Sequence, residues 1–403
     1  MTAATDRVNI IVSRLEAVCS DYIAYVKDWK ERTGRKAVGV LPMNFPVELV
    51  QAAGALPVFV QESDEPVTDG RNLIYEYYCA YSKSITDQAA KQWLDLFDGI
   101  FAVDHCVALL GALDAMRFAM PSRLVYLAQF PASMDEQASI DEVDKRMREL
   151  RRELEKLTGA AILPEAISEA IRSRNEARQI VRRLFALRRD GAINLSARMM
   201  QAIVQSGMIM DAAEYLETML ELEAALADFP PVHDRKVKLH LSGHFCHAPR
   251  PELFDMIEQC GAMIVDDDLY TGYRFVSTDV AETGDPAIAL RDWYFQRNVN
   301  VPCSTRAQKT ADWEGYLLQA LERSGADGVI ILMAKFCEPH MLYYPELRKT
   351  FRAQGVPYLL IETEHEGLAL EMLRTRVESL VELISKRRTA EASGQPGIKE
   401  TSV

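Results

Sequence analysis

Residues 45–60, FPVELVQAAGALPVFV, combine signals for a helix and for a strand. Pro46 and Glu48 suit the first turn of a helix, because proline already has a helical φ angle and a carboxylate interacts favourably with the helix dipole. Gly54 suits the residue after the helix, where a left-handed conformation is common. The apolar run that follows is typical of a buried parallel strand. The stretch therefore predicts a helix followed by a strand.

The same order recurs later in the chain, in RPELFDMIEQCGAMIVDDD (250–268) and YPELRKTFRAQGVPYLLIETE (344–364). Each begins with Pro and a Glu-Leu pair, reaches a Gly after about ten residues, and then turns apolar. With similar apolar runs nearby, we expect strands near 36–42, 55–60, 99–104 and 123–128, and near 236–242, 262–266, 328–334 and 357–362. The predicted fold class is α/β, with two Rossmann-like (flavodoxin-like) parallel-sheet lobes and a helical insert.

The segment between the two sets of strands has almost no strand signal. SIDEVDKRMRELRRELEKLTG has helical periodicity, and Pro164-Glu165 starts another long helix. We therefore predict an N-terminal lobe over 1–137, a helical insert over 138–232 and a C-terminal lobe over 233–388, closed by an amphipathic helix. The Ser/Gly/Pro-containing residues 389–403 are expected to form a disordered tail.

Composition excludes several classes of protein. The 403 residues are 48% hydrophobic and 26% charged, as in an ordinary soluble protein. The net charge of −13 disfavours nucleic acid as a partner, because phosphate binding needs a basic face. No stretch approaches the 18 or so uncharged apolar residues of a membrane span. The first residues, MTAATDRVNI, have no apolar core typical of a secretory signal, so a cytoplasmic location is expected.

The cysteines are scattered along the chain and form no CxxC motif. They are Cys19, Cys79, Cys106, Cys246, Cys260, Cys303 and Cys337. An odd number of cysteines in such a chain disfavours a disulfide framework, and their spacing disfavours a zinc ribbon or a classical ferredoxin. Spacing alone therefore identifies no site.

Position within the predicted elements is more informative than spacing. DGIFAVDHC and DGVIILMAKFC are strands that end shortly before Cys106 and Cys337. Ligands of doubly wound sheets collect beyond the carboxyl ends of the strands, so both thiols are expected at the functional edge of their lobes. Cys79 starts a predicted helix, where the helix dipole favours the thiolate. The alternative is that the three are unrelated core thiols.

Other polar residues also follow predicted strands. Cys246 is flanked by His244 and His247, which could line a binding pocket or, with a fourth ligand from elsewhere, hold zinc. Asp266, Asp267 and Asp268 could bind magnesium, although a solvated turn is the simpler expectation. Cys19 and Cys260 are expected to be packing residues, because free cysteine is commonly buried.

Several motifs together resemble a known family. They are FPVELVQAAGALPV, YYCAYSKS, VDHC, IEQCGAMIVDDDLYTGYR and MAKFCEPHMLYYPELRKTFRAQGVPYLLIETE. Over roughly residues 36–385, the chain resembles a subunit of the 2-hydroxyacyl-CoA dehydratase and benzoyl-CoA reductase family. The resemblance implies a [4Fe-4S] cluster held by Cys79, Cys106 and Cys337, with one iron open to another ligand. His105, beside Cys106, is a candidate catalytic residue that would donate a proton, or else a histidine hydrogen-bonded at a strand end.

The resemblance also implies partners. Members pair as heterodimers with a homologous iron–sulfur subunit, act on acyl-CoA, and receive electrons from a separate ATP-hydrolysing activator. The chain itself has no GxxxxGK[ST] motif for binding ATP phosphates. The likeness is greater to the smaller substrate-site subunit of the ATP-dependent benzoyl-CoA reductases, which form a cyclic dienoyl-CoA during anaerobic aromatic degradation. The alternatives are an (R)-2-hydroxyacyl-CoA dehydratase subunit, which eliminates water through a ketyl radical, and a non-catalytic electron-relay subunit.

Overall fold

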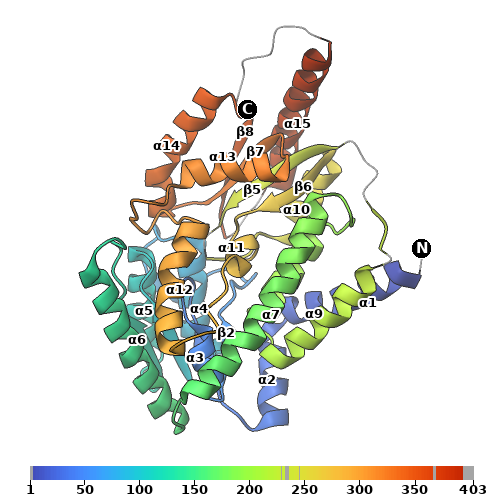
Figure 1. The fold of residues 1–403 in the computed structure, drawn as a ribbon. Coiled ribbons are helices and arrows are strands. Elements are labelled where there is room, and N and C mark those ends of the chain that lie inside the picture. The colour runs from blue at the N-terminus through green and yellow to red at the C-terminus, as the bar shows by residue number, and fades with distance from the viewer. Residues whose placement is uncertain (1–2, 228, 232–235, 245, 366–368, 394–403) are drawn as a thin grey trace.

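The computed structural model describes residues 3–227, 229–231, 236–244, 246–365 and 369–393 (Figure 1). Its N-terminal sheet has four parallel strands in the order β2-β1-β3-β4. These strands are β1 (Ala37–Val40), β2 (Leu56–Phe59), β3 (Gly99–Val103) and β4 (Leu124–Ala128). Its helices are α1 (Ala3–Ser20), α2 (Tyr22–Thr33), α3 (Val47–Ala52), α4 (Ala80–Ala90) and α5 (Val107–Ala119), with short 3₁₀ turns at Asp69–Asn72 and Trp93–Leu96.

The C-terminal sheet repeats this topology, with four parallel strands in the order β6-β5-β7-β8. They are β5 (Val237–Gly243), β6 (Ala262–Asp267), β7 (Gly328–Ala334) and β8 (Tyr358–Thr363). The helices in this part of the chain are α10 (Pro251–Gln259), α11 (Tyr273–Val276), α12 (Pro286–Asn300), α13 (Trp313–Ser324), α14 (Glu338–Gln354) and α15 (Leu370–Ala392), of which α12 packs against α6 and α7. The expected α/β class with two parallel-sheet lobes is confirmed, and all eight strands lie where the sequence predicts them.

Four helices occupy the segment between the sheets: α6 (Gln137–Thr158), α7 (Pro164–Arg189), α8 (Ala197–Ser206) and α9 (Ala212–Leu226). In α6 the buried residues Val143, Met147, Leu150 and Leu154 recur every three or four positions, which makes one apolar face. Helix α7 runs alongside both lobes in Figure 1 and packs against α3 and β6. The N-terminal helix α1 packs against α8 and α9, so it joins this helical layer in space. The domain boundaries themselves stay a prediction.

A continuous hydrophobic core joins the two lobes. One cluster of buried side chains includes Val40 of β1 and Phe101 of β3 together with Ile331 of β7 and Trp313 of α13. Burying such side chains is worth roughly 1.5–3 kcal/mol each, so this shared core fixes the lobes against one another. Among the described residues, none of the helices combines the length and apolar character needed to cross a bilayer.

Two local expectations are wrong in detail. Helix α14 begins at Glu338, so Pro345 lies inside it and does not start it. The reason is that Glu338 and Pro339 supply an earlier first turn with the same signals, an acidic residue and a proline. Helix α15 extends to Ala392, past the expected start of the tail at 389, and residues 394–403 lie outside the described residues.

Candidate iron–sulfur centre

The three predicted thiols occupy the same structural position. Cys79, Cys106 and Cys337 are the residues immediately before the first turns of α4, α5 and α14. Cys106 and Cys337 each lie three residues after the last residue of a central strand, β3 or β7. Because the strands are parallel, their carboxyl ends direct both thiols to the same kind of edge.

The environment of these thiols is apolar. Burial raises the pKa of Cys106 to about 12 and also raises the pKa values of Cys79 and Cys337. A backbone N–H group in the first turn of each following helix lowers the pKa again. These N–H groups belong to Ser82 for Cys79, Leu109 for Cys106 and His340 for Cys337. The three thiols are therefore neutral as free groups, but each has N–H donors in place to stabilise a negatively charged sulfur.

The structure brings the three thiols together from both lobes. Among the neighbouring charged groups, Cys79 has the largest effect in raising the pKa of Cys106. Both Cys79 and Cys106 raise the pKa of Cys337. Within the described ranges, no group of three His, Cys, Asp or Glu side chains is arranged to hold a single metal ion. Thiolates that share a [4Fe-4S] cluster each bind a different iron, so they need no such common point.

Two more cysteines, which the sequence does not assign to the site, belong to the same group. Besides burial, the thiols of Cys106, Cys79, Cys337 and Cys303 all raise the pKa of Cys246. Cys246 lies three residues after the last residue of β5, as Cys106 and Cys337 lie after β3 and β7. That shared offset is a signal in the sequence that could have identified Cys246. No comparable signal marks Cys303.

Cys303 is placed by tertiary contacts. Its N–H donates to Asn298 Oδ1 at 3.1 Å, and its Sγ lies 3.1 Å from Thr305 Oγ1. Arg274, buried at 2% exposure, donates through Nη1 to the carbonyl oxygens of Val301 and Pro302, both at 2.7 Å. These contacts fix the Cys303 segment against the C-terminal lobe.

His105 is buried beside this group of thiols. Its Nδ1 lies 3.2 Å from Thr305 Oγ1, which links it to the Cys303 segment. Burial, with the guanidinium groups of Arg306, Arg274 and Arg297 nearby, lowers the pKa of His105 well below its ordinary value. The imidazole is therefore neutral at physiological pH. Its catalytic role stays a prediction.

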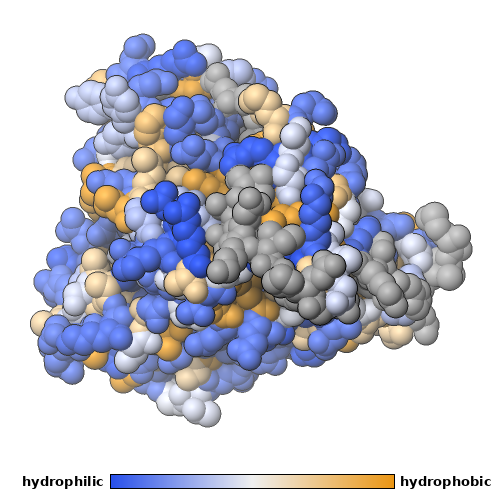
Figure 2. Space-filling view, turned by 90° about the horizontal axis from the view of Figure 1, so that it is seen from above, coloured by the Kyte–Doolittle hydropathy of each residue, from blue (hydrophilic) through white to orange (hydrophobic). Residues whose placement is uncertain are grey.

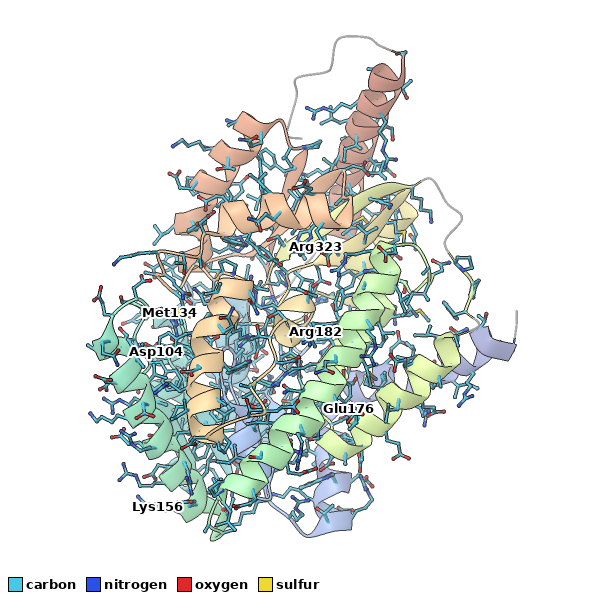
Figure 3. The ribbon with its side chains drawn as sticks, in the orientation of Figure 1. Asp104, Met134, Lys156, Glu176, Arg182 and Arg323 are labelled. Atoms are coloured by element: carbon cyan, nitrogen blue, oxygen red, sulfur yellow. The ribbon has the colours of Figure 1, made fainter. Side chains whose placement is uncertain are left out.

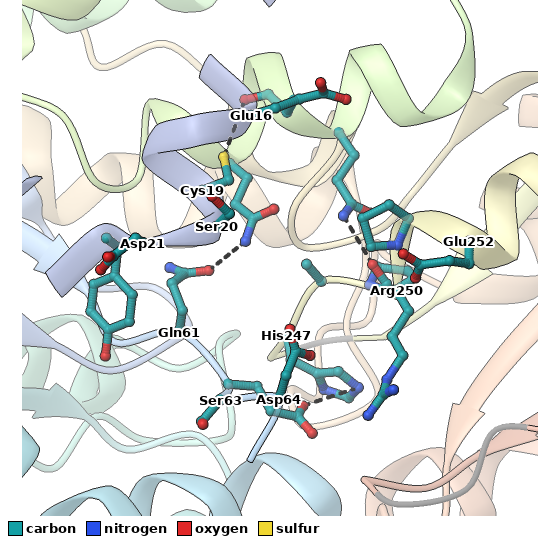
Figure 4. Close-up of a pocket in the computed structure, with 18 of the residues that line it drawn as sticks. Glu16, Cys19, Ser20, Asp21, Gln61, Ser63, Asp64, His247, Arg250 and Glu252 are labelled. Carbon is teal, nitrogen blue, oxygen red and sulfur yellow. Dashed lines mark hydrogen bonds and ion pairs between the residues drawn. The ribbon is translucent and has the colours of Figure 1, made fainter. Parts of the chain in front are cut away.

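A cavity of about 870 Å³ is lined by His244 and His247, which lie close to Cys246 in the sequence (Figure 4). Its wall is formed by α1 and by the segments that follow β2, β5 and β8. Glu62 Oε1 lies 2.5 Å from His365 Nδ1, and Glu62 Oε2 lies 3.7 Å from His247 Nε2. Burial would raise the pKa of Glu62, but these histidines and Arg250 hold it below its ordinary value. The His244 side chain hydrogen-bonds Thr363 Oγ1 at 2.7 Å.

The aspartates after Val265 do not form the solvated turn that the sequence predicts. Asp266 and Asp268 are fully buried and Asp267 is 7% exposed. Asp266 pairs with Arg189 at 3.2 Å and with Arg323 (labelled in Figure 3) at 3.7 Å. The carboxylates are buried because the helical layer and α13 supply cations, which could not be read from the local sequence.

The donor set fits an iron–sulfur cluster. It consists of one buried thiol, Cys79, and two half-buried ones, Cys106 and Cys337, with backbone N–H groups directed at them. Thiols are the preferred ligands of such clusters. Ser304 Oγ, in the residue next to Cys303, is buried and has no hydrogen-bond partner among the described residues. A buried polar atom without a hydrogen-bond partner destabilises the folded protein unless a bound group supplies that partner.

Comparison with known proteins gives consistent matches. The family model described as "2-hydroxyglutaryl-CoA dehydratase, D-component" matches residues 42–384. A benzoyl-CoA reductase subunit of Thauera aromatica is 24% identical over 378 residues, which cover 93% of this chain and 98% of that protein. The (R)-phenyllactyl-CoA dehydratase beta subunit of Clostridium sporogenes is 25% identical, covering 89% and 95%. The lactoyl-CoA dehydratase beta subunit of Anaerotignum propionicum is 26% identical, covering 94% and 100%.

Proposed function

The chain belongs to the 2-hydroxyglutaryl-CoA dehydratase D-component family, and we propose that it is the iron–sulfur subunit of a cytoplasmic, ATP-dependent benzoyl-CoA reductase. In this role it takes part in passing low-potential single electrons to the aromatic ring of benzoyl-CoA, which forms a cyclic dienoyl-CoA. A separate ATP-hydrolysing activator supplies the electrons. The observation that carries the proposal is the convergence of half-buried thiols from both lobes at the ends of β3 and β7.

Cys79, Cys106 and Cys337 would hold a [4Fe-4S] cluster. When bound, such a cluster supplies a one-electron carrier whose potential depends on its charge, its hydrogen bonds and its burial. The chain contributes the thiolates, N–H groups of the first turns of α4, α5 and α14, and an apolar surround that excludes water. Neutral His105, which contacts Thr305, would offer a hydrogen-bond donor next to Cys106 without adding charge.

Apolar side chains next to the proposed ligands support a partner subunit. Tyr75, Tyr77, Val107, Met341 and Leu342 are 46–79% exposed, and they lie within a few residues of the three cysteines. Figure 2 shows a face of the molecule on which hydrophilic residues predominate and hydrophobic ones gather only in small patches. An exposed apolar group around buried cofactor ligands is typical of a protein–protein contact. We assign it to a homologous subunit, since the relatives are named as subunits.

A dehydratase subunit is the second candidate. The observation that favours it is that two dehydratase beta subunits match this chain at 25% and 26% identity, against 24% for the reductase subunit. Identities this close do not separate the two reactions. Both candidates use the same thiols and differ in substrate.

The test is anaerobic co-purification of the chain with its partner subunit, followed by iron and sulfide analysis and EPR of the reduced protein. We expect cluster iron in the wild type and a lost or altered signal in Cys337→Ala, with Cys260→Ala as the control for a thiol outside the centre. With activator and ATP, the complex should reduce benzoyl-CoA. Turnover of 2-hydroxyacyl-CoA alone would select the dehydratase, and an iron-free wild type would overturn both candidates.

A further inference from the structure

The cavity between α1 and the segments after β2, β5 and β8 has an acidic wall. Among the described residues, seven carboxylates line it against two arginines, Arg198 and Arg250. The carboxylates come from separate elements, for example Glu16 from α1, Asp64 from the segment after β2 and Glu252 from α10 (Figure 4). Its volume is in the range of cavities that hold small organic ligands. Such an excess of negative charge attracts cations and disfavours anions.

Both arginines already have partners within the protein. Arg198 donates through Nε to Glu16 and through Nη1 to Asp255, both at 2.9 Å. Arg250 donates through Nη2 to the carbonyl oxygen of His365 at 2.8 Å. An anionic ligand would have to compete with these groups for the guanidinium N–H donors.

The hydrogen-bonding capacity that is left over in the wall consists of acceptors. His244 is 3% and Gln201 is 7% exposed, yet His244 Nδ1 and Gln201 Oε1 have no hydrogen-bond partner among the described residues. The Gln201 amide is oriented by its Nε2, which donates to the Pro249 carbonyl oxygen at 2.9 Å, so its oxygen can only accept. His244 Nδ1 accepts when Nε2–H donates to Thr363 Oγ1, 2.7 Å away. Glu62 Oε2 likewise accepts no hydrogen bond.

A group with several N–H donors and a positive charge would complete this site. Ammonium and guanidinium groups have such donors and no acceptor. A metal ion fits less well, since no three ligating side chains of the described residues are arranged to hold one. The first turn of α10 favours anions, but Glu252 lies in that turn and offsets this effect. We propose that the cavity binds a small organic cation through an ammonium or guanidinium group, with Glu62, Gln201 and His244 as acceptors.

The three acceptors belong to different parts of the molecule. Gln201 lies in α8 of the helical layer, Glu62 follows β2 of the N-terminal lobe, and His244 follows β5 of the C-terminal lobe. A ligand that bridges them stabilises the folded chain, because it binds the folded state and not the unfolded one. The inference does not depend on the proposed function, since neither acyl-CoA nor the activator takes part in this binding.

The test is isothermal titration calorimetry of the full-length chain, purified anaerobically, with three probes that share a butyl chain. Putrescine has two ammonium groups, butylamine has one and butanol has none. We expect saturable binding of both amines, with a rise in the unfolding temperature, and no binding of butanol. Glu62→Gln keeps the size of the side chain and removes its charge, so it should weaken butylamine binding about tenfold. Asp64→Asn combined with Glu252→Gln changes two exposed side chains, should weaken putrescine binding several-fold, and covers the case in which Glu62→Gln does not fold.

Glu346→Gln is the matched control, because this exposed carboxylate of α14 does not line the cavity. The inference is overturned if neither amine binds saturably, if butanol binds as tightly as butylamine, or if Glu346→Gln weakens binding as much as Glu62→Gln. The complex with the partner subunit should bind putrescine as the chain alone does. Loss of binding in the complex would overturn the free ligand and assign the site to a basic side chain of the partner. Failure of the proposed function would appear separately, as an iron-free chain.

Discussion

The two lobes share one topology but differ in what their strands bury. The N-terminal strands, AVGV, LPVF, GIFAV and LVYLA, contain no charged residue. The C-terminal strands bury His240, Ser242, Asp266 and Asp267 among their apolar residues. Both sheets nevertheless present a cysteine three residues beyond a central strand. The positions of the thiols therefore follow from the backbone topology that the sheets share, whereas the polar and charged residues buried in the strands differ between the two sheets.

The largest effect should come from the buried charges of the C-terminal lobe. Asp268 accepts hydrogen bonds from Ser242 Oγ, from the Gly243 N–H and from Trp313 Nε1 at 2.9–3.1 Å, and it lies 3.4 Å from Arg274. Asp268→Ala leaves the Arg274 charge buried without this carboxylate. We expect a loss of about 3–5 kcal/mol in the free energy of unfolding.

The measurement is urea unfolding followed by circular dichroism. The control in the other lobe is Ile100→Val in β3, which removes one buried methylene and should cost about 1 kcal/mol. Equal losses in the two variants would mean that the C-terminal sheet does not depend on its charges, and the contrast between the lobes would fail.

A second comparison uses one glycine from each sheet. Gly243→Ala meets the Leu332 carbonyl oxygen at 2.0 Å with φ +108°, so we expect a loss of about 2–3 kcal/mol. Gly39→Ala in β1 meets Ile100 Cδ1 at 2.6 Å, the movable end of a side chain, and should cost about 1 kcal/mol. Thermal unfolding of both variants checks the order. A reversed order would show that the turn after β5 is not held as tightly as its geometry indicates.

A third comparison concerns two aspartates with opposite pKa shifts. In the C-terminal lobe, burial raises the pKa of Asp267 from 3.8 to about 7. The folded state therefore binds a proton more tightly than the unfolded state, and stability from this group is lost as pH rises from about 4 through 7. Asp267→Asn should remove this fall in stability, which amounts to roughly 2–3 kcal/mol between pH 5 and pH 8.

In the N-terminal lobe the sign reverses. Burial would raise the pKa of Asp87, but the N–H groups of Gly70 and Thr68 and the charge of Lys91 hold it below 3.8. Stability from Asp87 is thus present above pH 3.8 and lost as pH falls below it. Unfolding midpoints measured from pH 3 to pH 8 should show Asp87→Asn altering only the acid side. If Asp267→Asn and Asp87→Asn changed stability in the same way across this pH range, the opposite pKa shifts assigned to the two aspartates would be contradicted.

The smallest effect should come from two lysines at the rim of the centre. Lys83 of the N-terminal lobe and Lys335 of the C-terminal lobe lie 5.8 and 5.5 Å from the ring of Phe336. Both make exposed contacts, so Lys83→Gln and Lys335→Gln should each change the free energy of unfolding by less than about 1 kcal/mol. Chemical unfolding at low and at high salt measures this. A larger loss in one variant would show that its lobe contributes more to holding Phe336 beside Cys337.

The alternation of helices and strands can be read from the amino-acid sequence alone. Gly54, Gly261 and Gly355 end the three α-then-β units with positive φ angles, as their patterns predict. The same patterns placed Cys106 and Cys337 after strands, because strand ends are set locally by where apolar residues stop. The predicted start of α14 was wrong because two prolines in this stretch, Pro339 and Pro345, carry equivalent signals.

Which residues far apart in the sequence come into contact depends on tertiary packing. Cys246 and Cys303 join the other thiols because the two lobes close on a shared core, and no local pattern records that closure. Asp266 is buried and not solvated because Arg189 and Arg323 reach it from α7 and α13. Local sequence fixes backbone conformation through short-range sterics and hydrogen bonds, whereas the burial of charge and the grouping of thiols depend on long-range packing.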